Sequence, residues 1–411
     1  MGTIDPRSGA EFSTAAKEVD SERLFQHVRA LEGPRDPSGH YQKLQAAGNY
    51  ILSSFQQVGL TTGIQEFSLE SGSSTYQNVE GAIPGSGPEL LVVAHYDTVP
   101  DSPGANDNAS AVAVMLEAAR VLKKVGSSNL RFIGFTLEES DPFFEGKIHH
   151  LAHSLGLMDS QHRYLRWHTQ KLMKQLSSLA KGMRLHAIDF AEAITLAHKQ
   201  LESEMDEKEN LLAQEVAVLY RGISYKSWPG ILATIGSARW VEQAIKRNAL
   251  IQGVICLDTV GYCSQQANSQ HHPPGFDPSV FPHHGISDFT RGNFLVAIGD
   301  GQSGFLSEAF CQQSAKPSVD LPHISLQLPL MFEQFAMGMP DLLRSDHAPF
   351  WRAGFPGLLL TDTADFRYPY YHTPADTIDK LDFDFLAKVC KAVVALAMAL
   401  TARTDNLLNV Q

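Results

Sequence analysis

Two histidines and several acidic residues in this sequence stand at, or shortly after, the ends of apolar runs. They are His95, Asp97, Glu138, Glu139, Asp258 and His372. Imidazole and carboxylate groups together form a ligand set that suits Zn²⁺, and the absence of a cysteine pair argues against a purely structural zinc site. Two zinc ions about 3.5–4 Å apart can polarise a carbonyl group and activate a shared water molecule. The residue types therefore predict a two-metal hydrolytic site.

The elements that must position these residues are four short apolar runs, of the kind found in strands buried on both faces. The runs are ELLVVA, LRFIGFTL (130–137), GVICL (253–257) and GLLLT (357–361). Between the first two, Val112, Leu116 and Ala119 fall on one helical stripe, so the chain runs strand, helix, strand. This order predicts an α/β fold with a mixed, mostly parallel central sheet flanked by helices. Ligands bind beyond the carboxyl ends of such strands, so we expect the polar residues to converge there.

Two aspartates, Asp107 and Asp97, have distinct expected roles in the site. Asp107 lies in the loop PGANDNAS before the predicted helix, and Gly104 allows the backbone to turn tightly beside it. Asp107 is therefore the candidate to bridge two metal ions. Asp97 stands two residues after His95, on the same side of an extended segment, and is expected to accept the second imidazole N–H and fix its tautomer.

The consecutive residues Glu138 and Glu139 are expected to have separate roles. Side chains of consecutive residues leave a strand in opposite directions, so the two carboxylates cannot easily bind the same ion. We assign Glu139 as a metal ligand and Glu138 as the general base that takes a proton from water and returns it to the leaving amine. Each residue taken singly would fit a capped turn or a solvated surface; the shared position after four apolar runs favours the metal site.

Residues 145–233 follow a different pattern. From Met158 to Arg221 there is no proline and one glycine, while apolar residues recur at helical intervals in two stripes. We interpret this segment as two long helices that form a hairpin inserted into the α/β domain, the second about 45–50 Å long. We expect a lid that restricts access to small peptides or an arm that forms a homo-oligomer; a surface insertion without function is the alternative.

The composition of the whole chain narrows its class. With 411 residues, 43% of them hydrophobic, and a net charge of −12, it is expected to be a soluble globular protein without a nucleic-acid or anionic-membrane partner. The four cysteines form no C-x-x-C pair, so no disulfide scaffold is predicted. We find no secretory signal and expect no transmembrane segment, which leaves a cytoplasmic or a processed, exported protein open. Residues 1–20 are expected to be a flexible arm or a cloning remnant, and a helical region spans 21–60.

Five motifs together resemble the co-catalytic zinc exopeptidases of clan MH, which include bacterial leucyl aminopeptidases and glutamate carboxypeptidase-type enzymes. They are HYDTVPDSPGANDNASA, FTLEES, LDTVGY, SDHAPFWRAGFP and YYHTPADTIDKLDF. The resemblance implies a zinc peptidase catalytic domain formed by 21–144 and 234–411, interrupted by the helical insertion at 145–233.

The resemblance also implies a role for each of these residues. His95 and Asp258 would hold one Zn²⁺, Glu139 and His372 the other, and Asp107 would bridge two Zn²⁺; Glu138 would be the base and Asp97 the partner of His95. A cis peptide bond is implied at Asp107–Asn108. Tyr371 would contact the substrate or an oxyanion, with packing as the alternative, while Asp346 and His347 would brace the site.

The sequence thus predicts a two-zinc exopeptidase that acts on peptides, with an aminopeptidase preferred. Acidic groups such as Glu138 and Asp258 can bind a substrate ammonium, whereas Arg352 or Arg367 would bind a carboxylate. The alternatives are a single-zinc acyl transferase resembling glutaminyl cyclase, and a non-catalytic binding domain on the same fold. The complete set of metal ligands argues against both.

Overall fold

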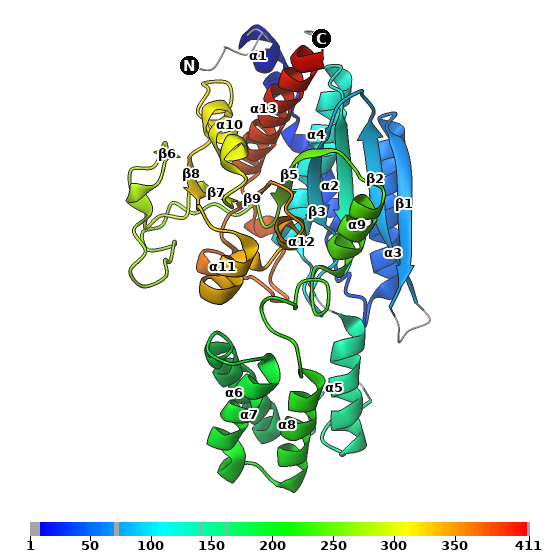
Figure 1. Cartoon of the computed structure of the whole chain (residues 1–411), viewed down its shortest axis with the longest axis vertical. Helices are drawn as coiled ribbons and strands as arrows, with labels where there is room; N and C mark the ends of the chain where they lie inside the picture. The colour runs from blue at the N-terminus through cyan, green and yellow to red at the C-terminus, as the bar shows by residue number, and fades with distance from the viewer. Residues whose placement is uncertain (1–8, 70–73, 140, 161–162, 409–411) are drawn as a thin grey trace.

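A nine-stranded mixed sheet forms the centre of the computed structural model, which describes residues 9–69, 74–139, 141–160 and 163–408 (Figure 1). The strand order is β1-β2-β4-β3-β5-β9-β7-β8-β6. The strands are β1 (Thr61–Ser68), β2 (Thr75–Ile83), β3 (Glu89–His95), β4 (Leu130–Phe135), β5 (Ile251–Leu257), β6 (His283–His284), β7 (Leu295–Gly299), β8 (His323–Gln327) and β9 (Gly357–Thr361). The four predicted strands are β4, β3, β5 and β9, which are adjacent and mutually parallel. The predicted fold class is confirmed, and the antiparallel pairs lie towards the two edges.

Strand β3 shows why the predicted runs are continuously apolar. Leu90 and Val92 pack into the core on one face of the sheet, whereas Leu91 and Val93 pack into the core on the other face. All four side chains are fully buried, because alternate residues of a strand point to opposite faces and both faces are covered. The apolar run therefore fixes the strand, and the first polar residue after it falls at the sheet edge.

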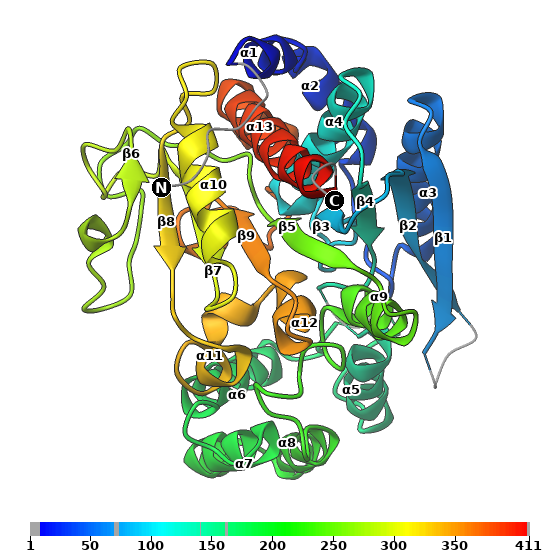
Figure 2. The ribbon, with the colours of Figure 1, turned by 45° about the horizontal axis from the view of Figure 1, so that its top comes forward.

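Helices cover both faces of the sheet (Figures 1 and 2). One core includes side chains from α1 (Gly9–Lys17), α2 (Ser21–Leu31), α3 (Tyr41–Gln57), α4 (Ala111–Lys124), α10 (Gly304–Ser314) and α13 (Phe383–Leu408). The other includes side chains from α9 (Ile235–Lys246), α11 (Phe332–Gly338) and α12 (His347–Arg352). The chain passes from β3 through α4 to the parallel neighbour β4, as the predicted crossover requires.

The N-terminal part of the chain is more structured than predicted. Within the segment 1–20, which we expected to be a flexible arm, residues 9–17 form α1; residues 1–8 lie outside the described residues. Phe12 and Ala15 are only 3% and 1% exposed, so burial of these two side chains holds α1 against the core. The helical region 21–60 is two helices, separated at 32–40, where prolines and glycines interrupt the pattern.

We expected no transmembrane segment from the sequence, but among the described residues one helix, α13, has the length and composition of a membrane span. Phe383–Ala402 is 20 residues long with a mean hydropathy of 1.9. However, 89% of this apolar stretch is buried inside the protein, so its hydrophobicity is explained by packing in the core between α4 and α10.

The predicted two-helix hairpin is wrong, because the described residues of the segment form four α-helices. These are α5 (Pro142–Ser154), α6 (Trp167–Met183), α7 (Phe190–Leu201) and α8 (Glu207–Leu219), called here the four-helix segment. The predicted second helix breaks at Asp206, which caps the start of α8 and forms a reciprocal capping box with Glu209. Leu172, Ala197 and Ala213 belong to a small core inside the segment, which is separate from the cores of the sheet. The segment protrudes from the body in both views (Figures 1 and 2).

Candidate metal centre

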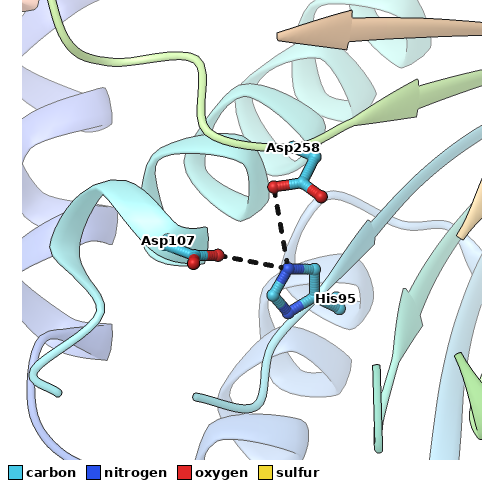
Figure 3. Close-up of side chains that lie close together, drawn as sticks. All are labelled: His95, Asp107 and Asp258. Atoms are coloured by element: carbon cyan, nitrogen blue, oxygen red, sulfur yellow. Dashed lines mark ion pairs between the residues drawn. The ribbon is translucent and has the colours of Figure 1, made fainter. Parts of the chain in front are cut away.

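Asp107 lies between the two histidines that the sequence singled out. Its Oδ1 atom is 3.3 Å from His95 Nε2, and its Oδ2 atom is 3.1 Å from His372 Nε2. Asp258 approaches His95 from the end of β5, with its Oδ1 atom 3.9 Å from Nε2 (Figure 3). Glu139 approaches the other imidazole, with its Oε2 atom 3.1 Å from His372 Nε2. The carboxylate of Asp107 therefore faces two groups of potential ligand atoms, one around His95 and one around His372.

These separations fit metal ligation. Two atoms bound to one tetrahedral zinc ion at about 2.0–2.1 Å are about 3.3 Å apart, close to the 3.1–3.9 Å found here. In the three groups His95/Asp107/Asp258, His95/Glu138/Glu139 and Asp107/Glu139/His372, the ligand atoms all lie within 4.8 Å of one another. Most of these side chains are buried, whereas the His372 side chain is 33% exposed and marks the open side of the site. The five predicted ligands therefore converge as expected.

Asp97 holds the backbone of the two glutamates. Its Oδ1 and Oδ2 atoms accept hydrogen bonds from the backbone N–H groups of Glu138 and Glu139, each at 3.1 Å. Its Oδ1 atom is 3.6 Å from His95 Nδ1, which is within ion-pair range but longer than a hydrogen bond, so Asp97 faces the imidazole nitrogen whose partner it was expected to be. The carboxylate of Glu138 lies nearer to His95, with Oε2 3.8 Å from Nε2, while Glu139 lies nearer to His372. The two glutamates therefore approach different imidazoles.

The cluster concentrates negative charge in a buried place. Burial raises the pKa of Glu138 well above its ordinary value, and burial together with the charge of Asp107 raises the pKa of Glu139 to about 7. Burial lowers the pKa of His95, but the nearby carboxylates outweigh burial and raise it well above the ordinary value. The same balance raises the pKa of His372 to about 10. Among the described residues, no lysine or arginine is ion-paired with these carboxylates, so bound cations would relieve their repulsion.

The loop that carries Asp107 depends on a glycine. Gly104 has a φ of +62°, and a Cβ atom there would clash with the side chain of Thr98 and with the backbone oxygen of Asp107. The predicted cis peptide bond at Asp107–Asn108 is confirmed. The Asn108 amide then donates to Leu257 O and accepts from Thr259 N–H, which ties this loop to the end of β5 beside Asp258.

Two supporting residues were missed by the sequence analysis. Asp376 accepts the backbone N–H groups of Asn106 and Asp107, at 2.8 and 3.1 Å. It belongs to the motif YYHTPADTIDKLDF, so its position could have indicated a role. Arg35 is buried and donates to backbone carbonyls that include Tyr96 O and Gly104 O, which fixes the loop after β3. No sequence pattern marked Arg35.

The remaining candidates lie around this centre. The ring of Tyr371 stacks on the ring of His372 at a centroid distance of 3.8 Å, and Arg344 donates to its hydroxyl oxygen at 3.2 Å. Asp346 is fully buried, and burial raises its pKa to about 7. His347 is buried as well, with its Nε2 2.8 Å from Leu342 O and its ring against Trp351. Neither belongs to the three groups of ligand atoms.

The two arginines considered as carboxylate binders are occupied elsewhere. Arg352 donates to Pro229 O at 2.8 Å, and Arg367 donates to Phe294 O at 2.6 Å and to the Gln270 side chain at 2.7 Å. Arg367 is only 3% exposed, so it offers no charge to a substrate.

Comparisons with known proteins show the family of the chain. A family model for peptidase family M28 matches residues 78–217 and 299–397. The uncharacterized protein YfbL of Escherichia coli (strain K12) is 23% identical over 394 residues, which cover 92% of this chain and 88% of that protein. Aminopeptidase YwaD of Bacillus subtilis is 50% identical over 74 residues, or 18% of this chain and 13% of that protein.

Solved structures share the fold. The LapA aminopeptidase of Legionella pneumophila has a TM-score of 0.56 at 16% identity, covering 98% of this chain and 78% of that one. A glutaminyl cyclase of Porphyromonas gingivalis has a TM-score of 0.52 at 16% identity, covering 93% and 99%. At this identity the likeness shows the fold alone, so the chemistry has to be argued from the site.

Proposed function

The chain belongs to peptidase family M28, and on that premise we propose that it is a two-zinc aminopeptidase, which removes N-terminal residues from peptides. The observation that carries the proposal is the position of Asp107, whose two oxygens face two different histidines at 3.3 and 3.1 Å. His95 and Asp258 would hold one ion, Glu139 and His372 would hold the other, and Asp107 would bridge them. When bound, the ions would polarise the scissile carbonyl and lower the pKa of the attacking water.

Glu138 is the general base in this proposal. Its carboxylate is buried beside His95, and it is not needed to complete either pair of metal ligands. Burial raises its pKa, which makes the carboxylate a stronger base for the proton of water. Glu138 would take a proton from the attacking water and return it to the leaving amine. Asp97 would hold Glu138 in place through the backbone N–H bond.

Tyr371 is proposed to contact the substrate. Its ring lies on His372, and the cation of Arg344 is bound to its hydroxyl oxygen, which leaves the hydroxyl hydrogen free to donate. A donor at this position can stabilise the negative charge that develops on the carbonyl oxygen.

The end of the peptide that is recognised follows from charge. The centre presents a surplus of carboxylates, which attract an ammonium group, while Arg367 is buried and Arg352 donates to Pro229 O. An aminopeptidase is therefore favoured over a carboxypeptidase.

A glutaminyl cyclase activity is the second candidate, because solved cyclases share the fold with similar TM-scores. That reaction would need one zinc ion, so the complete second group of ligands around His372 counts against it.

A substrate panel tests the proposal. We expect the purified chain to hydrolyse leucine p-nitroanilide and leucyl dipeptides, to lose this activity with a chelator, and to regain it with added zinc. N-acetylated versions of the same substrates should be hydrolysed at least about a hundredfold more slowly, because the ammonium contact is lost. Preference for the blocked substrates would refute the aminopeptidase assignment, and cyclisation of glutaminyl peptides without hydrolysis would favour the second candidate.

A further inference from the structure

The two proposed metal positions are held by different parts of the fold. His95 is the last residue of β3 and Asp258 directly follows β5, which pairs with β3, so the sheet itself places both side chains (Figure 3). We call this pair the strand site. His372 and Glu139, called here the loop site, lie outside the strands, and His372 comes after the end of β9 at Thr361, with a φ of +56°. The position of His372 therefore depends on contacts between loops.

Asp376 joins the loop of His372 to the loop of Asp107. It lies shortly after His372 in the chain and accepts three consecutive backbone N–H groups. Its backbone oxygen accepts Ala105 N–H at 3.2 Å, its Oδ1 atom accepts Asn106 N–H at 2.8 Å, and its Oδ2 atom accepts Asp107 N–H at 3.1 Å. Since Asp107 Oδ2 lies 3.1 Å from His372 Nε2, these bonds set how the two proposed ligands face each other.

The carboxylate of Asp376 is also fixed in its rotation. The Tyr368 hydroxyl donates to Oδ1 at 2.7 Å, so Oδ1 accepts from two donors and Oδ2 from one. Asp376 is fully buried and Tyr368 is 2% exposed. If the carboxylate turned away, buried donors would lose their partners, which costs more than the bonds contribute on average. The side chain is therefore held in one orientation.

The loop of Asp107 has its own connections to the end of β5. The Asn106 amide oxygen accepts Gly261 N–H at 2.9 Å, and the Asn108 amide donates to Leu257 O at 3.1 Å. Leu257 is the last residue of β5, and Gly261 lies in the chain that follows it. Asp107 would therefore keep its place if the bonds from the histidine loop were removed, whereas that loop would lose its attachment to Asp107.

We propose that Asp376 is a positioning residue that sets the affinity of the loop site for its metal ion, and that the strand site does not depend on it. The inference rests on the proposed two-zinc function. Asp376 acts through the turn that carries His372 and through the N–H group of Asp107, and it belongs to none of the three groups of potential ligand atoms. Residues that support metal ligands in this way typically contribute about 10–100-fold to metal affinity.

The test is a zinc titration of the full, metal-free chain against a chromophoric chelator, which yields a dissociation constant for each ion. In Asp376→Asn we expect one ion to bind about 10–100-fold more weakly than in the wild-type chain and the other to change by less than about threefold. The reason is that an amide oxygen can still accept from Asn106 and Tyr368, but the amide NH₂ then faces the N–H of Asp107.

Further variants identify the weakened ion and control for the substitution. Adding His372→Ala to Asp376→Asn should leave one ion of wild-type affinity, whereas adding His95→Ala should leave none. Tyr368→Phe removes one neutral donor, so it should weaken the same ion by at most about tenfold. The matched control Asp379→Asn, an aspartate side chain that is 65% exposed in the same loop, should leave both affinities unchanged.

Two outcomes would overturn the inference: unchanged affinities for both ions in Asp376→Asn, or an equal loss at both sites, which a general loss of structure would produce. If Asp376→Asn fails to fold, Tyr368→Phe decides in the same way, by a selective loss at one site or by its absence. The wild-type chain separates this inference from the function on which it rests. Fewer than two bound ions there would refute the proposed two-zinc function, whereas two ions with no selective loss in the variants would refute only the role of Asp376.

Discussion

Acidic residues have opposite surroundings in the two main regions of this molecule. At the carboxyl edge of the sheet, Asp107 and Glu139 are buried beside other carboxylates, and their partners are histidines. In the four-helix segment, Asp206 accepts the backbone N–H of Glu209 at 2.9 Å and pairs with Arg166, so the protein itself satisfies its charge. From this difference we infer where a ligand would bind: the carboxylates at the sheet edge would need cations from outside, whereas Asp206 has its partners within the protein.

The largest expected effect is the loss of activity in Glu138→Gln, compared with the same substitution at an exposed glutamate of the four-helix segment. Glu138→Gln should lower kcat/KM for leucine p-nitroanilide by about 10²–10⁴-fold, because general-base catalysis contributes this much. The bound zinc should be unchanged, since Glu138 is not a proposed ligand. The matched substitution Glu202→Gln, at an exposed position beside α7, should leave the rate within about twofold. Steady-state kinetics and elemental analysis on all three chains measure the contrast.

Loss of zinc from Glu138→Gln would contradict this division of roles, because it would make Glu138 a ligand. Full activity with full zinc content would remove it from the mechanism.

Core truncations test whether the two regions are separate units. Leu360 in β9 and Leu172 in α6 are both fully buried, so replacing either with alanine should cost about 2–5 kcal/mol. Because Leu172 belongs to the separate core of the four-helix segment, Leu172→Ala should accelerate hydrogen exchange in α6–α8 and leave β3–β5 protected. Leu360→Ala should accelerate exchange in the sheet and reduce activity. Equal acceleration in both regions by Leu172→Ala would show a single cooperative unit.

The pH dependence of stability should have opposite signs in the two regions. In the metal-free chain, Glu139 and Asp346 have pKa values raised to about 7, so the folded state keeps protons that the unfolded chain releases near its ordinary values of 4.5 and 3.8. Their contribution to stability is complete below about pH 4 and is lost as the pH rises through about 7. The pKa of Asp206 is lowered, mainly by the backbone N–H of Glu209, so its contribution is present above its ordinary value of 3.8 and is lost below it.

Calorimetry and hydrogen exchange on the metal-free chain measure this prediction. The melting temperature of the body should be at least about 2 °C higher at pH 5 than at pH 8. The free energy of opening of α8, obtained from exchange rates corrected for the intrinsic pH dependence of amide exchange, should not rise from pH 8 to pH 5. A metal-free body that is more stable at pH 8 would contradict the account of repelling carboxylates.

The residues of the candidate metal centre could be chosen from the sequence because each proposed ligand has a local signal. His95 and Asp258 stand at or directly after buried strands, whose apolar runs are unambiguous, and parallel strands end at the same edge. The residues that hold the loops of the proposed ligands in place could not be predicted in the same way. Arg35 binds backbone carbonyls of the loop after β3, and such a contact depends on how distant segments pack. The short edge strands, such as β6 with two residues, also carry too little pattern to detect.

In the four-helix segment, the apolar pattern identified the buried face correctly but did not reveal where one helix ends and the next begins. Leu201, Met205 and Ala213 all face the same small core, so the helical spacing of apolar residues continues across the break between α7 and α8. Periodicity reports which face is buried and not where a helix stops. The signal for the break is Asp206 with Glu209 three residues later, which form a capping box.

The central claim is that the strand ends hold two zinc ions bridged by Asp107, and a zinc titration of the metal-free chain tests it most directly. Bound zinc, determined by elemental analysis, and the rate on leucine p-nitroanilide would be followed together. We predict two zinc ions per chain, full activity only when both are bound, and loss of at least one ion in Asp107→Ala. Saturation at one zinc ion per chain with full activity, or two ions retained in Asp107→Ala, would contradict the claim.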